Sequence, residues 1–357
     1  MAQETLRDSR ATSETRALYH HLAALAPSHL IIGQQNLYRE GHGWQWQGTP
    51  DFEAVSGKLP GVMGIDFREV HEGGEKAWKH YSESVQKFHK KGGIVTLSWH
   101  MQNPVSDKNF FDKTPAVSKI LPGKALHQKY KDWLDLLAKF LFEQKDESGN
   151  LIPILFRPFH EHNGNWFWWS VTDSVCQQFC FLGFINDSYV QKANQEFIAL
   201  WRFTIDYLVR QRGLHNLIIV YSPGILSDSS KGLLYRYPGD GYVDILAYDK
   251  YGPSLTPYLG ALRDLVIQAR HRKKLAALAE TGYEGIPNPL YFTDQVLDVL
   301  KNDALAKQLA YVMFWKNSGR SGQEGHYFLP YLGHASRPNF LQMLSDPFIL
   351  TIDWKSK

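Results

Sequence analysis

Eight short apolar runs recur along the chain, and each is rich in β-branched residues without strict apolar–polar alternation. This pattern is typical of strands that are covered on both faces in a parallel sheet. Between several runs lie stretches with helical spacing of apolar residues, at 130–142, 196–211 and 258–270. The predicted strands are 30–35, 62–67, 94–100, 151–160, 217–222, 243–251, 275–281 and 309–316. Strands and helices that alternate in this way predict a (β/α)8 TIM barrel, with a doubly wound open sheet as the main alternative.

The open sheet is disfavoured by the turn after the first predicted strand. A dinucleotide-binding sheet carries a glycine-rich phosphate turn there, whereas residues 36–44 match no such fingerprint. No linker, internal repeat or low-complexity tract divides the chain. We therefore predict a single catalytic domain over residues 1–357, with a barrel core at about 30–320 and a helical insertion at 171–194.

Charge and hydropathy exclude several classes of partner. The 39 basic and 36 acidic residues give a net charge of +3 without a long run of one sign, so nucleic acid is not an expected partner. The apolar runs are too short for a membrane span, and the printed start lacks the apolar core of a signal peptide. Cys176 and Cys180 have no matching pair elsewhere, which disfavours a zinc ribbon and predicts free thiols.

Polar residues follow nearly every predicted strand at its carboxyl end, where chemistry is located in such barrels. This observation nominates candidate site residues on strands two to eight. They include Asp66, Trp99, His100, Arg157, His160, Glu161, Ser222, Asp249, Tyr251, Glu280, Trp315 and Lys316.

Two glutamates stand out within this set. Glu161 precedes a cluster of tryptophans that includes Trp166, and a carboxyl group among aromatic rings is expected to keep its proton near neutral pH. Glu280 follows small apolar residues and needs a partner such as Arg157 or Tyr251. Glutamates on strands four and seven match a retaining glycosidase, whose carboxyl groups lie about 5 to 5.5 Å apart. The alternative is structural: a rim ion pair for Glu161 and a paired or helix-capping role for Glu280.

Four segments of the chain resemble glycoside hydrolase family 26, whose characterised members are mostly β-mannanases. The segments are Arg-Pro-Phe-His-Glu-His-Asn-Gly-Asn-Trp-Phe-Trp-Trp at 157–169, Gly-Gly-Ile-Val-Thr-Leu-Ser-Trp-His-Met-Gln-Asn-Pro at 92–104, Val-Asp-Ile at 243–245 with Asp249 and Tyr251, and Ala-Glu-Thr-Gly at 279–282. The resemblance implies a retaining barrel enzyme without metal or cofactor, with Glu161 as acid/base and Glu280 as nucleophile. It also implies that His160 replaces a more usual Asn before the acid. The full set expected to bind substrate is His100, Trp99, Arg157, His160, Trp166, Tyr251, Trp315, Lys316 and Asp66. Two residues depart from the family pattern: His162 stands where a Met or Asn is frequent, and Lys316 stands where an Arg is often found. Lys cannot form the two-armed contact of an Arg.

The implied substrate is β-1,4-mannan or mannooligosaccharides, and a polymer substrate implies a secreted or periplasmic protein. Family-related β-1,3-1,4-glucanase and β-1,3-xylanase activities remain alternatives, since loop contacts decide specificity. The segments 42–46 and 171–194 are hypothesised to block one end of the cleft, which would favour exo-action with short products. Two other readings stay open: a zinc site on His160 and His162, and a carbohydrate-binding protein without catalysis.

Overall fold

The computed structural model describes residues 6–170, 187–227 and 231–356. Its strands are β1 (Leu30–Gln35), β2 (Glu40–Gly41), β3 (Trp44–Gln45), β4 (Val62–Asp66), β5 (Ile94–Ser98), β6 (Ile154–Arg157), β7 (Leu217–Tyr221), β8 (Ile245–Tyr251), β9 (Leu275–Gly282), β10 (Tyr311–Phe314) and β11 (Ile349–Leu350). The α-helices are α1 (Ser13–Leu25), α2 (Asp51–Ser56), α3 (Phe67–Glu72), α4 (Gly74–Lys90), α5 (Val117–Ile120), α6 (His127–Glu143), α8 (Asp187–Ile205), α9 (Leu259–His271), α10 (Asp298–Lys301) and α11 (Arg337–Ser345). Two segments wind more widely, as π-helices, at Asp206–Gln211 and Tyr291–Leu297.

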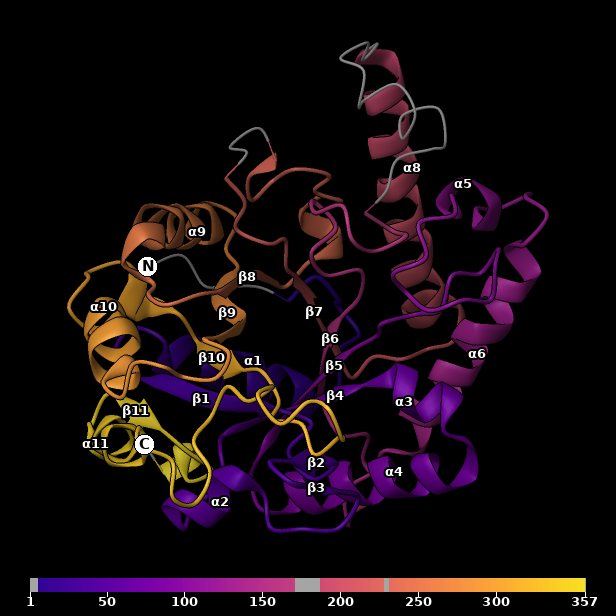
Figure 1. Cartoon of the computed structure of the whole chain (residues 1–357). Coiled ribbons are helices and arrows are strands. Elements are labelled where there is room, and N and C mark those ends of the chain that lie inside the picture. Colours follow the sequence, from indigo (N-terminus) through magenta and orange to yellow (C-terminus); the bar gives the residue numbers. More distant parts are fainter. Residues whose placement is uncertain (1–5, 171–186, 228–230, 357) are drawn as a thin grey trace.

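Eight parallel strands form a closed barrel with helices around it (Figure 1). Their order is β10-β9-β8-β7-β6-β5-β4-β1, and pairing of β1 with β10 closes the ring. The prediction of a (β/α)8 barrel and of its eight strands is thus confirmed, because β1 and β10 would not pair with each other in an open sheet. The short strand β11 pairs with β1 beside the ring, and β2 with β3 makes a separate hairpin.

Strand residues alternate between the barrel interior and the helical layer, as the two-residue period of a strand requires. Ile31, Leu155 and Ala277 belong to the inner apolar cluster, whereas Leu30 and Ile32 pack in the outer one. Tyr19 and Leu22 of α1 join the inner cluster, and the Tyr19 hydroxyl donates to the Asp244 carbonyl just before β8. Helix α1 therefore closes the amino-terminal end of the barrel and leaves the carboxyl ends of the strands for polar side chains.

The three predicted amphipathic helices are present. Phe197, Trp201 and Ile205 of α8 are buried, and the buried residues of α9 include Leu262 and Val266. Burial of one apolar stripe supplies most of the stability of such helices. In Figure 1, α8 extends well beyond the barrel.

The predicted insertion at 171–194 divides at Asp187. Residues 187–194 are the start of α8, whereas 171–186, with Cys176 and Cys180, lie outside the described residues. The packed structure continues past the predicted core end at 320, because α11 and β11 pack against the barrel. A single domain over 1–357 remains our proposal. Within the described ranges, no helix combines the length and apolar character needed to cross a bilayer.

Candidate active site

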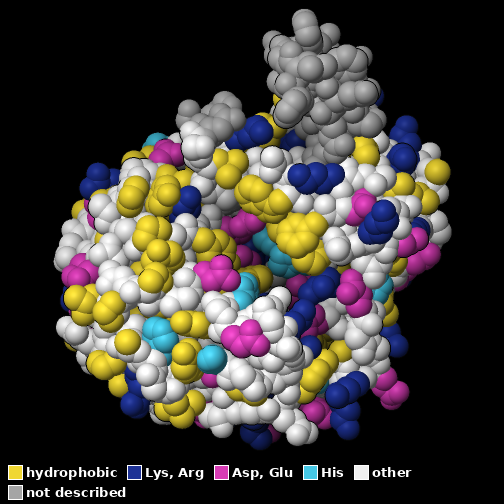
Figure 2. Space-filling model, viewed as in Figure 1, with side chains coloured by type: hydrophobic (Ala, Val, Ile, Leu, Met, Phe, Trp, Pro, Cys, Tyr) yellow, Lys and Arg dark blue, Asp and Glu magenta, His cyan; other side chains and the backbone are white. Residues whose placement is uncertain are grey.

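Polar side chains gather at the carboxyl ends of the strands because of the same two-residue period. Asp66 of β4, Arg157 of β6 and Asp249 of β8 occupy positions that share the inward face of their strands. All three are buried. Figure 2 shows acidic and histidine side chains gathered in a hollow of this face, beside apolar ones.

Glu280 reaches the same face through an irregularity in β9. Tyr248 pairs with Leu278 and the next residue, Asp249, pairs with Glu280, so Ala279 is an extra residue. Strict alternation would turn Glu280 toward the helices, because Ala277 and Ala279 already point inward. A bulge of this kind re-aims the side chain that follows it. It sets Glu280 beside Asp249.

Glu161 is held by a turn rather than by a strand. The prediction of a strand up to His160 was wrong at its end, because β6 stops at Arg157 and the chain then turns. Phe159 and Glu161 adopt left-handed φ values of 48° and 53°, which are costly for residues with a Cβ. The backbone N–H of Glu161 donates to the Ser222 carbonyl at 2.8 Å, which fixes the turn against the end of β7.

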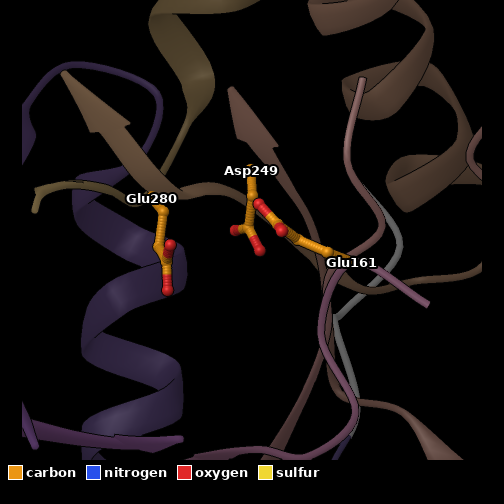
Figure 3. Close-up of side chains that lie close together, drawn as sticks. All are labelled: Glu161, Asp249 and Glu280. Carbon is orange, nitrogen blue, oxygen red and sulfur yellow. The ribbon is translucent and has the colours of Figure 1, made fainter. Parts of the chain in front are cut away.

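Three carboxylate side chains lie close together, those of Glu161, Asp249 and Glu280 (Figure 3). Oxygens of Glu161, Asp249 and Glu280 all lie within 4.8 Å of one another. The buried guanidinium of Arg157 donates to Asp249 Oδ2 at 2.8 Å and to Glu280 Oε1. One cation is therefore shared by two of the three acids.

Both carboxylate oxygens of Glu280 accept hydrogen bonds from side chains of the site. Its Oε1 accepts from Arg157, and its Oε2 accepts from the Tyr251 hydroxyl at 2.7 Å. Burial, and then the charge of Glu280, raise the pKa of Tyr251 well above its usual value, so this phenol keeps its proton and donates. These two contacts orient the Glu280 carboxylate and place a cation beside it, which suits a nucleophile.

Glu161 has the opposite environment. Burial, followed by the negative charge of Glu280, raises its pKa to about 7. Trp166 Nε1 donates to Glu161 Oε2 at 2.7 Å and opposes that rise. The side chain is therefore a carboxylic acid that can release its proton near neutral pH.

Asp249 and Ser222 were predicted to end their strands with polar side chains, but neither was given a role in catalysis or substrate binding. The Ser222 hydroxyl donates to Asp249 Oδ1 at 2.6 Å, while burial, opposed by Arg157, raises the pKa of Asp249 well above its usual value. The available signal was alternation, because Ile245, Ala247 and Asp249 share one face of β8.

His100 and His160 lie side by side, next to the rings of Phe167 and Trp169. Their Nε2 atoms are 3.1 Å apart, and His100 Nδ1 lies 2.8 Å from Asp66 Oδ2. The Phe167 ring is 5.3 Å from His100 and 4.4 Å from the ring of Trp169, whose Nε1 donates to the His160 carbonyl. These aromatic contacts fix the two imidazoles in the hollow.

Trp315 and Lys316 follow the end of β10. The Trp315 ring centroid is 6.0 Å from that of His100, so both rings border the same hollow. Lys316 pairs with Glu40 of the β2–β3 hairpin, which Arg320 also contacts at 3.4 Å. The ammonium of Lys316 is thus already committed to a buried carboxylate.

Trp99 does not lie where we predicted it. Its ring packs 4.9 Å from Phe67 and 5.9 Å from His71, and only 3% of the residue is exposed. The reason is alternation on β5, which turns position 99 toward the helical layer when position 98 points inward. We therefore assign Trp99 to the packing of α3 against the barrel.

His160 and His162, the two histidines considered as zinc ligands, point into different surroundings. The His162 ring packs 4.7 Å from Phe197 and 5.0 Å from Tyr221, away from His160. In the described part of the chain, the group with metal-ligand spacing is Glu161, Asp249 and Glu280. Because Arg157 already supplies a cation to two of these acids, their arrangement is explained without a metal ion.

Comparison with known proteins agrees with this architecture. The family model described as Glycosyl hydrolase family 26 matches residues 7–317. A mannan endo-1,4-beta-mannosidase of Bifidobacterium adolescentis is 30% identical over 363 residues, which cover 94% of this chain and 34% of that protein. The chain spans little more than a third of that relative and of another from Caldalkalibacillus mannanilyticus.

Solved structures match over nearly the whole chain. The GH26 beta-mannanase BoMan26A of Bacteroides ovatus is 33% identical with a TM-score of 0.81, covering 96% of this chain and 95% of that one. The catalytic domain of an endo-beta-1,4-mannanase of Bacillus sp. JAMB-750 is 29% identical with a TM-score of 0.85, covering 99% and 95%. This chain is therefore a member of glycosyl hydrolase family 26.

Proposed function

We propose that the chain is a β-1,4-mannanase that works by double displacement. The observation that carries the proposal is the pair Glu161 and Glu280, in which one carboxylate oxygen of each lies within 4.8 Å of one of the other, in different electrostatic environments. Retaining enzymes place their carboxyl groups about 5 to 5.5 Å apart, whereas inverting enzymes need about 6.5 to 9.5 Å to admit a water. The separation supports the retaining course.

In the first step, Glu280 attacks the anomeric carbon while Glu161 protonates the leaving oxygen. In the second step, Glu161 takes a proton from water, which attacks the same carbon and releases the sugar from Glu280. Arg157 and Tyr251 hold the Glu280 carboxylate in its orientation, and neither step consumes a cofactor. The names of the relatives support mannan as the polymer.

The cleft rim supports a further part of the proposal, namely release of short products from a chain end. Residues 40–45 are tied to the segment after β10 by the pair of Lys316 with Glu40. They are also tied through Asp51 of α2, whose Oδ2 accepts from the His42 backbone N–H and from Asn317 Nδ2, each at 2.7 Å. A firmly held hairpin beside Trp315 would shorten that end of the cleft. Early products dominated by long oligosaccharides would contradict this part.

A polymer substrate also supports our proposal that the protein is secreted or periplasmic.

The test uses Glu161→Gln and Glu280→Gln beside wild type, with Glu284→Gln as matched control. Glu284 lies on the loop after β9 and pairs with His326 at an exposed position. Each protein is incubated with β-1,4-mannan, mixed-linkage glucan and β-1,3-xylan, with and without EDTA, and products are separated by chromatography. We expect mannan cleavage by wild type and Glu284→Gln, unaffected by EDTA, and near abolition in the other two.

The stereochemical course is read by proton NMR of the first product formed. A β anomer that appears before mutarotation supports double displacement, whereas an initial α anomer would contradict it. Cleavage of glucan or xylan in place of mannan would reassign the substrate, and binding without cleavage of any polymer would favour a carbohydrate-binding protein.

A further inference from the structure

Asp66, His100 and His160 form a continuous chain of hydrogen bonds that ends beside the proposed acid. The Oδ2 atom of Asp66 lies 2.8 Å from His100 Nδ1, and His100 Nε2 lies 3.1 Å from His160 Nε2. All three side chains are buried. The remaining ring nitrogen of His160, Nδ1, is buried without a protein partner.

The other oxygen of Asp66 is fully occupied. Its Oδ1 accepts from the backbone N–H of Arg68 and from that of His100, each at 3.0 Å. The two oxygens of a carboxylate are equivalent, so whichever oxygen accepts from the two backbone donors, the other one faces the imidazole. This occupancy corrects the prediction that Asp66 binds substrate directly.

We propose that Asp66 is a positioning residue that sets on which nitrogen His100, and through it His160, carries its proton. The inference deepens the proposed function, on which its activity readout rests. An Asp66 carboxylate can only accept, so the proton of His100 is on Nδ1 and its Nε2 is left as an acceptor. His160 must then donate from Nε2, which leaves its Nδ1 as an acceptor.

The consequence for substrate binding is a defined polarity. A group that meets His160 Nδ1 has to donate a hydrogen bond, as a sugar hydroxyl does, and a group that only accepts is rejected. Burial, and then the cation of Arg157, hold the pKa of His160 well below its usual value, so this imidazole stays neutral. The residue next to Glu161 therefore keeps one fixed tautomer.

The substitution Asp66→Asn reverses this polarity without removing a bond. The amide oxygen keeps the two backbone donors, so the amide NH2 faces His100 Nδ1, which must become an acceptor. His100 then carries its proton on Nε2 and donates to His160, whose proton moves to Nδ1. Both imidazoles are thus predicted to change tautomer together.

A second Asp–His pair, Asp8 with His215, offers a matched control. Asp8 Oδ2 lies 2.8 Å from His215 Nδ1, and Asp8 Oδ1 accepts from the backbone N–H of Arg10 at 3.0 Å. The substitution Asp8→Asn should therefore change the tautomer of His215 and leave the two site histidines and the activity unaltered.

The experiment is nitrogen-15 NMR of the intact protein with labelled histidine, assigned through His100→Gln and His160→Gln, because protonated and bare ring nitrogens give well-separated signals. We expect one proton on Nδ1 of His100 and one on Nε2 of His160 in wild type, and the reverse in Asp66→Asn. Unchanged tautomers in Asp66→Asn, or a doubly protonated His100 in wild type at neutral pH, would overturn the proposal.

Kinetics give the second readout. Asp66→Asn is expected to lower kcat on mannooligosaccharides at least tenfold, but to change it less than threefold when His100 is already Gln, because the effect passes through His100. Equal losses in both backgrounds would also overturn the proposal. Since the tautomers are read without substrate, inactivity of wild type on mannan would refute the proposed function and leave this test intact.

Discussion

The hydrogen bond from Trp166 to Glu161 predicts a change in pH dependence that runs against simple intuition. Trp166 Nε1 donates to Glu161 Oε2 at 2.7 Å, and this bond stabilises the ionised carboxylate. The substitution Trp166→Phe removes the donor while keeping a ring. The acid should then hold its proton more tightly, and activity should persist to higher pH.

The size of the change follows from the bond. A hydrogen bond to a charged group contributes about 1.5 to 3 kcal/mol, and we take the lower value because both side chains are partly exposed. At about 1.4 kcal/mol for each pKa unit, the pKa of Glu161 rises by about one unit, from about 7 to about 8. Since the acid must be protonated, the basic limb of kcat/KM moves upward by the same amount.

The assay is a pH profile of kcat/KM on a mannooligosaccharide for wild type and Trp166→Phe. Trp78→Phe is the matched control, because Trp78 Nε1 donates in the same way to Glu143 at an exposed position far from the site along the chain. A lower kcat/KM overall is expected from lost sugar contact and does not affect the reasoning. A basic limb that stays in place or moves downward would refute it.

Three further predictions concern the same carboxylates. Glu161→Gln should raise the free energy of unfolding above pH 7 by about 1 to 3 kcal/mol, where the lower value allows for screening by solvent. The pKa of Glu161 is raised in the folded state, so wild type loses stability as the pH rises from about 4.5 to about 7. Urea denaturation at several pH values would measure this difference. Arg157→Met should lower that free energy by about 3 to 5 kcal/mol at neutral pH, because it leaves Asp249 and Glu280 buried without a cation, and by less in acid, where a carboxylate can take up a proton. Tyr251→Phe should lower kcat/KM by about ten- to a hundredfold, the value of one hydrogen bond to a charged group.

Two matched substitutions test the last two predictions. Arg212→Met breaks the exposed pair with Asp135 and should cost no more than about 1 kcal/mol at any pH. Tyr130→Phe removes a buried hydroxyl bonded to Thr204 and should leave kcat/KM unchanged. A stability loss for Arg212→Met as large as that for Arg157→Met, or a drop in activity for Tyr130→Phe, would show that burial of charge and contact with Glu280 are not the causes.

The barrel could be predicted from the sequence because its strands are short apolar runs covered on both faces, and that pattern depends on local composition alone. The site could be predicted only in part. Trp99 was wrongly predicted to bind substrate because it is an aromatic residue at a strand end. The two-residue period of the strand instead turns its side chain toward the helices. The bulge at Ala279 and the left-handed turn at Glu161 depend on pairing between distant strands, which a single sequence does not display.

The shared environment of the two glutamates has a consequence for the timing of the proposed reaction. The negative charge of Glu280 is one reason why Glu161 holds its proton up to about pH 7. When Glu280 forms an ester with the sugar, that charge disappears, and the proton affinity of Glu161 falls at the moment when it has given its proton away. Hydrolysis of the ester restores the charge and with it the affinity. The same residue is thus an acid before the bond breaks and a base afterwards, and the covalent step itself alternates the two states.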